Sequence, residues 1–372
     1  MVVKVDIDFP EKLKKYGAIN LDECFNCGNC TAVCPLSEGR ESFPRKIIRY
    51  SQLGLSSKLK SSKEIWLCYY CGECSDTCPR QAEPGELMAA ARRYAIASYD
   101  VTGLSKVYYT SKLFSFLIVT AVAIILFFLF LHNAGSMNTQ KLELFKFITF
   151  DSVHKIGIFV IIISFLVFIA GILRMIRALK GELKETKNGR IKRAFTEVIK
   201  ELVLQERFGE CKEEKEPFFL NRRILHWMIM WGFIGLGLAT ALDYLFLEIA
   251  GKVPGKALPL WHPTRLLGTL AGLSLLYGTT VTLILRTIKK DKYFSHSLTS
   301  DWFLVLFLWL AAVTGFIVEI SLYVHNPSKW MYIVFLVHIV VSMELVLLIP
   351  FTKFAHAVYR PIALIILKIK ET

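Results

Sequence analysis

Eight of the nine cysteines form two runs with identical spacing. In each run three cysteines are separated by two residues each, and a fourth follows after three more residues, directly ahead of a proline: Cys24, Cys27, Cys30 and Cys34, then Cys68, Cys71, Cys74 and Cys78. This spacing is typical of bacterial ferredoxins with two [4Fe–4S] clusters, in which the fourth cysteine of each run ligates the other cluster. We therefore predict one cluster on Cys24, Cys27, Cys30 and Cys78, and a second on Cys68, Cys71, Cys74 and Cys34.

The alternative is a pair of zinc sites, but zinc has no use for this doubled triple-cysteine spacing. Met1–Pro10 carries charges and no continuous apolar core, so it does not resemble a secretory signal. We expect the cysteine region in the cytoplasm, where structural disulfides are rare. Cys211 has no second cysteine nearby, and we expect it to be a plain thiol.

Histidines in the apolar part of the chain are candidate axial ligands of haem b, whose usual protein ligand is neutral imidazole. His338 and His356 are 18 residues apart in the last apolar segment, about five helical turns. We expect both on one helix face, one near each membrane surface, with a bend at Pro350 between them. His226 follows Arg222 and should lie level with His356. We predict that His226 and His356 hold an inner haem.

The outer haem needs a partner for His338 on the opposite side of the membrane. His154 and His262 both begin apolar segments on that side, and we favour His154 because Gly157, one turn further on, leaves room for a porphyrin. For any one histidine the alternative is a hydrogen bond between helices. Four histidines at paired depths favour haem ligation.

Ionisable residues within apolar segments are candidate functional groups. Asp243 and Glu319 lie towards the outer ends of their segments, and Arg265 is on the same side. This is where a quinol could release protons, so we predict a quinone site there; ordinary solvation at helix ends is the alternative. Glu344 lies deeper.

Six apolar segments are each long enough to cross about 30 Å of hydrocarbon. They are approximately Leu113–Leu131, Val153–Ile172, Ile224–Ile249, Leu266–Leu285, Trp302–Val324 and Met331–Phe354. The connectors and tail on one side hold 22 Lys and Arg, against 5 on the other. The positive-inside rule therefore predicts an inner-membrane protein with both termini and the cysteine region in the cytoplasm. The same distribution explains the net charge of +14 through membrane lipid; we see no nucleic-acid motif.

The connecting sequence predicts helices. Pro84–Tyr99 reads as a helix that begins at its proline, and Arg190–Gly209, inside an inner connector of about residues 188–210, as an amphipathic helix on the membrane surface or against the head. Alternation over Val3–Phe9 predicts a short strand. Gly232, Gly235 and Gly237 lie inside an apolar helix and favour close packing over nucleotide binding. The predicted fold is all-α: an α-helical dicluster ferredoxin domain over residues 1–110, fused to a six-helix cytochrome b-type membrane domain over residues 111–372.

Several stretches resemble known families. In the head these are "PRKIIRYSQLG", "IWLCYYCGECSDTCP" and "ARRYA", which resemble the iron–sulfur C subunit of heterodisulfide reductases. The anchor stretches "HPTRLLGTLAG" and "PFTKFAHAVYRP" resemble the cytochrome b subunit (E) of membrane heterodisulfide reductase and, more distantly, the gamma subunit of respiratory nitrate reductase. That gamma subunit likewise has two haem-ligating histidines 18 apart and takes both partners from one earlier helix. Here His226 matches one partner, but Leu236 stands at the other position.

Fusion of such modules is similar to the membrane subunit (C subunit) of quinone-interacting membrane-bound oxidoreductase (Qmo) complexes. The resemblance implies electron transfer between menaquinone and flavin-containing, heterodisulfide reductase A-like soluble subunits, linked to adenylylsulfate (APS) reductase. We see no flavin site in the chain. Two alternatives stay open: the anchor of a heterodisulfide- or sulfite-reductase-linked complex, distinguished by its copurifying subunits, and an iron–sulfur-regulated transporter, which would show inverted repeats or broken helices.

Overall fold

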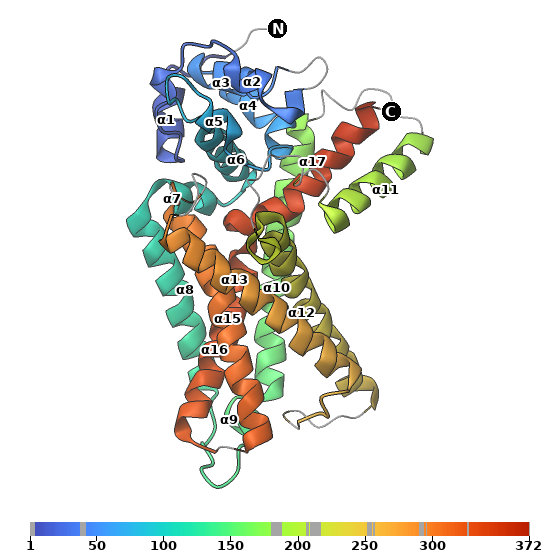
Figure 1. Cartoon of the computed structure of the whole chain (residues 1–372). Helices are drawn as coiled ribbons and strands as arrows, with labels where there is room; N and C mark the ends of the chain where they lie inside the picture. The colour runs from blue at the N-terminus through green and yellow to red at the C-terminus, as the bar shows by residue number, and fades with distance from the viewer. Residues whose placement is uncertain are drawn as a thin grey trace.

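The computed structural model describes residues 4–37, 42–179, 188–205, 208, 217–250, 255, 257–289, 294, 296–325 and 327–371. Within these ranges every regular element is a helix and no strand is present, which confirms the all-α class. Short helices form a head at one end of a bundle of long helices, and both ends of the chain lie on the side of the head (Figure 1). Cys211 lies outside the described residues.

The head consists of short helices packed around one long one. They are α1 (Phe9–Lys15), α2 (Asn29–Ala32), α3 (Arg45–Gln52), α4 (Ser56–Lys60), α5 (Glu73–Asp76) and α6 (Pro84–Tyr99), followed by α7 (Leu104–Thr110). The long helix α6 has the predicted bounds, and its Met88 and Ala90 are fully buried. Every short helix is too short to be stable alone, so packing on α6 has to stabilise them.

The predicted N-terminal strand is wrong. From Phe9 the chain is helical, and Ile7 is 89% exposed. Before the helix, the backbone N–H of Asp6 donates to the carbonyl of Gly54 at 2.9 Å, in a loop contact rather than a ladder. The described residues of the head include no strand with which this segment could pair, and Phe9 is buried as the first residue of α1.

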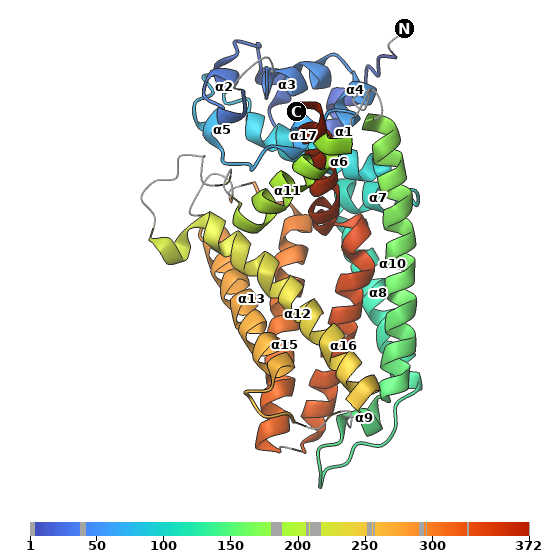
Figure 2. The ribbon, with the colours of Figure 1, turned by 90° about the vertical axis from the view of Figure 1, so that its right-hand side faces the viewer.

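Six long helices form the second part of the molecule. They are α8 (Lys112–His132), α10 (Phe150–Leu179), α12 (Arg222–Ala250), α13 (Pro263–Thr287), α15 (Thr299–Val324) and α16 (Lys329–Leu348), with the short α9 (Leu144–Phe147) at the end far from the head. In the described part of the chain these six are long and apolar enough to cross a membrane, so the chain is a multi-pass membrane protein. With 30 residues, α10 is about 45 Å long, and it runs along the bundle and on beside the head (Figure 2).

The last apolar segment is not one helix. The first helix, α16, ends at Leu348, two 3₁₀ turns follow over Ile349–Phe351 and Lys353–Ala355, and a new helix, α17 (His356–Glu371), begins. Pro350 lacks the amide that a continuous helix needs. The prediction that His338 and His356 share one helix face is therefore wrong. Instead α17 turns away from the bundle and lies under the head (Figure 1).

The amphipathic connector helix, α11 (Asn188–Leu204), packs on α17. Its Ala194 and Val198 are buried, whereas Phe195 of the predicted apolar stripe is 55% exposed. The C-terminal end of α11 is held at the start of α12, where the indole Nε1 of Trp227 donates to the carbonyl of Val203 at 3.0 Å. The connector thus joins the tail helix to the beginning of α12.

Close contact between α12 and α13 depends on a glycine. A Cβ at Gly232 would lie 2.7 Å from the amide nitrogen of Leu275 and 2.8 Å from the carbonyl oxygen of Ala271, so the backbones themselves would have to separate. At Gly237 nothing lies within 4 Å of the corresponding position. We expect Gly232→Ala to destabilise the protein by about 1–3 kcal/mol, the usual cost of overpacking. Thermal unfolding in detergent should show a lower Tm for Gly232→Ala and little change for the matched control Gly237→Ala; equal effects would contradict this role.

Candidate metal centres

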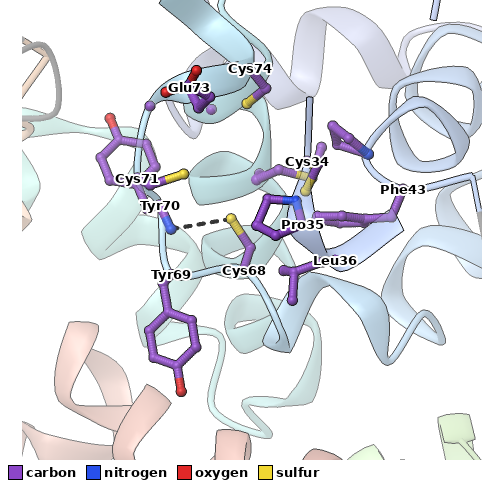
Figure 3. A pocket seen from close by; sticks show the side chains of 14 residues that line it. Cys34, Pro35, Leu36, Phe43, Cys68, Tyr69, Tyr70, Cys71, Glu73 and Cys74 are labelled. Atoms are coloured by element: carbon purple, nitrogen blue, oxygen red, sulfur yellow. Dashed lines mark hydrogen bonds between the residues drawn. The ribbon is translucent and has the colours of Figure 1, made fainter. Parts of the chain in front are cut away.

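The eight cysteines lie around two separate cavities in the head. One cavity is lined by Cys34, Cys68, Cys71 and Cys74 (Figure 3). The other is lined by Cys24, Cys27, Cys30 and Cys78. These are the two sets expected from the spacing, with the fourth cysteine of each run at the cavity of the other run. We call the first set the inner cysteines and the second the outer cysteines.

Each cavity offers four thiols, the donor number of one [4Fe–4S] cluster. In a cubane each thiolate is held on a different iron, whereas a mononuclear zinc site gathers its sulfurs within about 2.3 Å of one ion. Among the described residues no three His, Cys, Asp or Glu side chains come close enough to hold a single metal ion. The lining of the inner cavity also includes Glu73, and the four cysteines remain the set that fits a cluster.

The two cysteine loops have the same backbone pattern. Asn26 and Tyr70, at equivalent positions, both have a left-handed conformation, and so do Gly28 (φ 90°) and Gly72 (φ 92°) two residues later. This winding turns amides towards sulfur: the N–H of Tyr70 donates to Cys68 Sγ at 3.3 Å. Hydrogen bonds of this kind tune the reduction potential of iron–sulfur clusters. A non-glycine residue such as Tyr70 is strained in this conformation, as is common at functional sites.

Each set contains one buried cysteine, Cys68 among the inner and Cys30 among the outer. Cys27 is the exposed one of the eight, two residues after Phe25, which is itself 60% exposed. Burial raises the pKa of Cys30 and of Cys34 to about 11. These thiols would become thiolates by binding metal, which releases their protons.

The rings of His226 and His356 are neighbours, with their centroids 6.4 Å apart and their planes tilted by 54°. Each ring uses Nδ1 for a hydrogen bond, His226 with Oε1 of Gln205 at 3.1 Å and His356 with the carbonyl of Lys353. This leaves both Nε2 atoms for a ligand. Two imidazoles on opposite sides of one metal, each about 2.0–2.1 Å from it, have ring centres about 6 Å apart. Burial lowers the pKa of His356 to about 4, so this ring is neutral at neutral pH, the form that ligates metal.

The histidine pair and the inner cysteines are joined by a chain of aromatic contacts. Tyr69, next to Cys68, packs on Phe208 with ring centroids 4.9 Å apart, and Phe208 packs on His226 at 5.5 Å. Arg222, one turn before His226, donates to the carbonyls of Tyr70 at 2.6 Å and Tyr69 at 3.0 Å. The two candidate centres are therefore neighbours across the boundary between head and bundle.

The structure does not bring the predicted outer pair together in the same way. His338 hydrogen-bonds Thr314 of α15 through Nδ1 at 2.9 Å. The ring of His154 stacks on Tyr244 of α12 at 4.6 Å, and His262 hydrogen-bonds Thr264 at 2.9 Å. Neither of the two makes a ring contact with His338, although all three are described. Ligation by His338 with His154, or with His262, stays a prediction.

The predicted quinone-site residues do lie near one another. Arg265 of α13 forms an ion pair with Glu319 of α15, which also accepts a hydrogen bond from Thr269 at 3.1 Å. Asp243 of α12 is within electrostatic range of Arg265. Three helices thus contribute charged groups to one place at the end of the bundle far from the head. Deeper in the bundle, Glu344 is 1% exposed.

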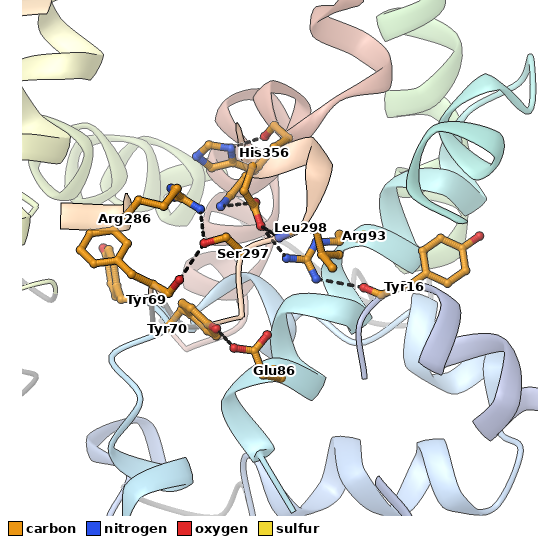
Figure 4. Close-up of polar contacts among 12 residues, drawn as sticks. Tyr16, Tyr69, Tyr70, Glu86, Arg93, Arg286, Ser297, Leu298 and His356 are labelled. Carbon is orange, nitrogen blue, oxygen red and sulfur yellow. Dashed lines mark hydrogen bonds and ion pairs between the residues drawn. The ribbon is translucent and has the colours of Figure 1, made fainter. Parts of the chain in front are cut away.

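Sequence reasoning missed a buried ion-pair network between head and bundle (Figure 4). Asp301, in the first turn of α15, accepts from Lys353 at 2.8 Å and from Arg93 of α6 at 3.2 Å, and Arg93 also donates to the carbonyl of Tyr16 at 2.9 Å. The carbonyl of Lys353 accepts the hydrogen bond from His356. An acidic residue in the first turn of an apolar segment was the available signal, but its partners come from distant parts of the chain.

Asp301→Asn is expected to destabilise the protein by about 3 kcal/mol, because it leaves the buried Arg93 and the partly exposed Lys353 without their counter-charge. The matched control is Asp151→Asn, whose exposed ion pair with Lys155 at 2.7 Å should contribute little. Thermal unfolding of both variants in detergent checks this. A Tm for Asp301→Asn as high as that of the control would show that the network does not stabilise the junction.

Two protein families match separate parts of the chain. Residues 20–82 match the family described as 4Fe-4S dicluster domain, and residues 119–372 match the family described as Citrate utilization protein B. The heterodisulfide reductase C-like protein of Archaeoglobus profundus is 38% identical over 104 residues, 26% of this chain and 55% of that protein. The C subunit of the H(2):CoB-CoM heterodisulfide,ferredoxin reductase of Methanothermobacter thermautotrophicus is 35% identical over 91 residues, 24% of this chain and 49% of that protein.

A further relative carries the name of the second family. Citrate utilization protein B of Escherichia coli is 32% identical over 152 residues, 40% of this chain and 38% of that protein. The chain thus spans about half the length, or less, of these curated relatives, and no solved structure matches it. Its head is like the C subunit of heterodisulfide reductases, and by the match over residues 119–372 the chain belongs to the Citrate utilization protein B family.

Proposed function

We propose that the chain is the membrane electron-transfer component of a quinone-dependent oxidoreductase complex. It would transfer electrons between menaquinone in the bilayer and soluble, heterodisulfide reductase A-like partner proteins that contain flavin. The observation that carries this proposal is the continuous contact from His226 through Phe208 and Tyr69 to the loop of Cys68. Two [4Fe–4S] clusters in the head and haem b in the bundle would supply one-electron chemistry.

The position of each residue suggests which cofactor it would hold. His226 and His356 would hold the inner haem, with Gln205 and Lys353 fixing the ring orientations through Nδ1. His338 would hold an outer haem, with His154, or alternatively His262, as its partner. The inner cysteines would hold the cluster nearest the membrane, and the outer cysteines the cluster next to the surface. Exposed Cys27 marks where a soluble partner would approach.

At the far end of the bundle, the charged residues would serve the quinone. The ion pair holds the Glu319 carboxylate beside the Arg265 guanidinium, and a carboxylate in this position could accept a proton from a quinol hydroxyl. Asp243 would share this role. The described helix ends that flank the basic connectors, the end of α10 and the start of α12, lie towards the head, so we place the head and both termini in the cytoplasm, on the inner membrane.

The soluble partner decides the pathway. The resemblance to Qmo complexes favours APS reductase in sulfur metabolism. The match over residues 119–372 favours a second candidate, a partner that acts in citrate utilization. Purification of the native complex and identification of the copurifying proteins would separate the two.

A reduced-minus-oxidised visible spectrum of the detergent-purified protein tests the proposal, with haem and non-haem iron quantified on the same sample. We expect two haems and about eight non-haem irons, and oxidation of both kinds of centre on addition of a menaquinone analogue. If only one haem is found, the assignment of the inner haem to His226 and His356 stands and the outer haem site is rejected. Absence of haem from folded protein would overturn the haem assignment altogether.

A further inference from the structure

Three arginines from three different helices contact the loop of Cys68, two at its backbone and one at the ring of Tyr69. Arg92 of α6 donates to the carbonyl of Cys68 at 2.8 Å. Arg222 of α12 donates to the next two carbonyls, and the guanidinium of Arg360 of α17 lies 3.7 Å from the centre of the Tyr69 ring. We call Arg92, Arg222 and Arg360 the arginine collar.

Two of these arginines are tied to the histidine pair by helical spacing. Arg222 precedes His226 by four residues in α12, and Arg360 follows His356 by four residues in α17. Residues four apart lie on the same helix face one turn from each other. Each of the two helices therefore contributes a histidine to the His226–His356 pair and, one turn away, an arginine to the Cys68 loop. A single turn separates the two candidate centres on each helix.

The collar acts on the sulfur ligands through charge. The guanidinium group of arginine is always charged in proteins. Arg92 and Arg222 hold theirs within hydrogen-bond distance of the carbonyls of Cys68, Tyr69 and Tyr70. The collar lies behind the Cys68 loop, and none of its arginines lines the inner cavity, whose lining includes Glu73. The outer cavity is lined by one arginine, Arg45, which is exposed to solvent.

We propose that the arginine collar raises the reduction potential of the inner cluster above that of the outer one. When the head holds a single electron, that electron then lies on the inner cluster, next to the membrane. This rests on the proposed function, which supplies the clusters and the electron donor. Reduction adds one electron and one negative charge to a cluster, with no bond made or broken. Cations held in a partly dry site stabilise that charge by Coulomb attraction.

The test is a redox titration of the full-length protein in detergent, with the electron paramagnetic resonance signals of the two reduced clusters recorded. Arg222→Gln should lower the potential of one cluster by the equivalent of about a tenfold change in its reduction equilibrium, which is about 59 mV for one electron. The other signal should stay in place. Arg222→Lys keeps the charge and should recover most of the shift. Arg92→Gln provides an independent second variant if Arg222→Gln folds poorly.

Two controls make the result specific. Cys71→Ala should lack the signal that Arg222→Gln shifts, which assigns it to the inner cluster. Arg45→Gln should shift the other signal alone. If neither collar variant moves a potential, or if both clusters move equally, the inference is overturned while the proposed function stands. Wild-type protein with haem but no iron–sulfur signals would overturn the proposed function as well.

Discussion

Cys71→Ala is expected to remove one [4Fe–4S] cluster and leave the other in place. The inner and outer cysteines line separate cavities, so the loss of one thiolate opens one cluster only. Non-haem iron should fall from about eight to about four per chain, and one of two reduced-cluster signals should vanish. Electron transfer from quinol to a soluble acceptor should drop at least tenfold, because a centre in the middle of the route is missing.

Cys27→Ala is the matched partner of this variant. Cys27 occupies in the first run the position that Cys71 occupies in the second. Its loss should remove the cluster of the outer cysteines and the signal of that cluster. Cys211→Ser, the ninth cysteine, should change neither signal. If Cys34→Ala removed the cluster of Cys24 instead of that of Cys71, the exchange of fourth cysteines between the runs would be wrong. Bound zinc in place of iron would contradict both cluster assignments.

The sequence predicted correctly those helices that depend on residues close to one another along the chain. The helix over Pro84–Tyr99 begins at a proline that needs no amide partner, and its bounds agree with the prediction. The six long helices follow from apolar length alone. The break between α16 and α17 was anticipated only as a bend, because a proline in an apolar run is compatible with a kink as well as with a new helix.

The arrangement of side chains needed tertiary contacts that the sequence does not display. Depth in the membrane placed His226 level with His356, and the structure brings these rings together. Depth does not fix the rotation of a helix about its axis, so His154 faces Tyr244 of α12. The arginine collar could not be predicted from the sequence either. The spacing from His356 to Arg360 can be read from the sequence, but Arg360 reaches the Cys68 loop only because the chain turns at Pro350 and brings α17 under the head.

The second large effect is expected at the histidine pair. His226→Ala and His356→Ala should each remove the inner haem, because a low-spin haem b loses its coordination when either axial imidazole is absent. Half of the haem absorbance should disappear from the reduced-minus-oxidised spectrum, and reduction of the clusters by quinol should slow at least tenfold. Reduction of the clusters by dithionite, which acts directly on the head, should be unaffected.

His132→Ala is the control, since this histidine is exposed at the end of α8. It should leave haem content and the rate of quinol oxidation unchanged. His338→Ala should remove the other half of the haem absorbance while the inner haem stays. If His226→Ala kept both haems and full quinol-linked reduction of the clusters, the pair would be a packing contact between α12 and α17. Electrons would then have to reach the inner cysteines directly from a quinone bound on the head side of the membrane, not from the Arg265–Glu319 end.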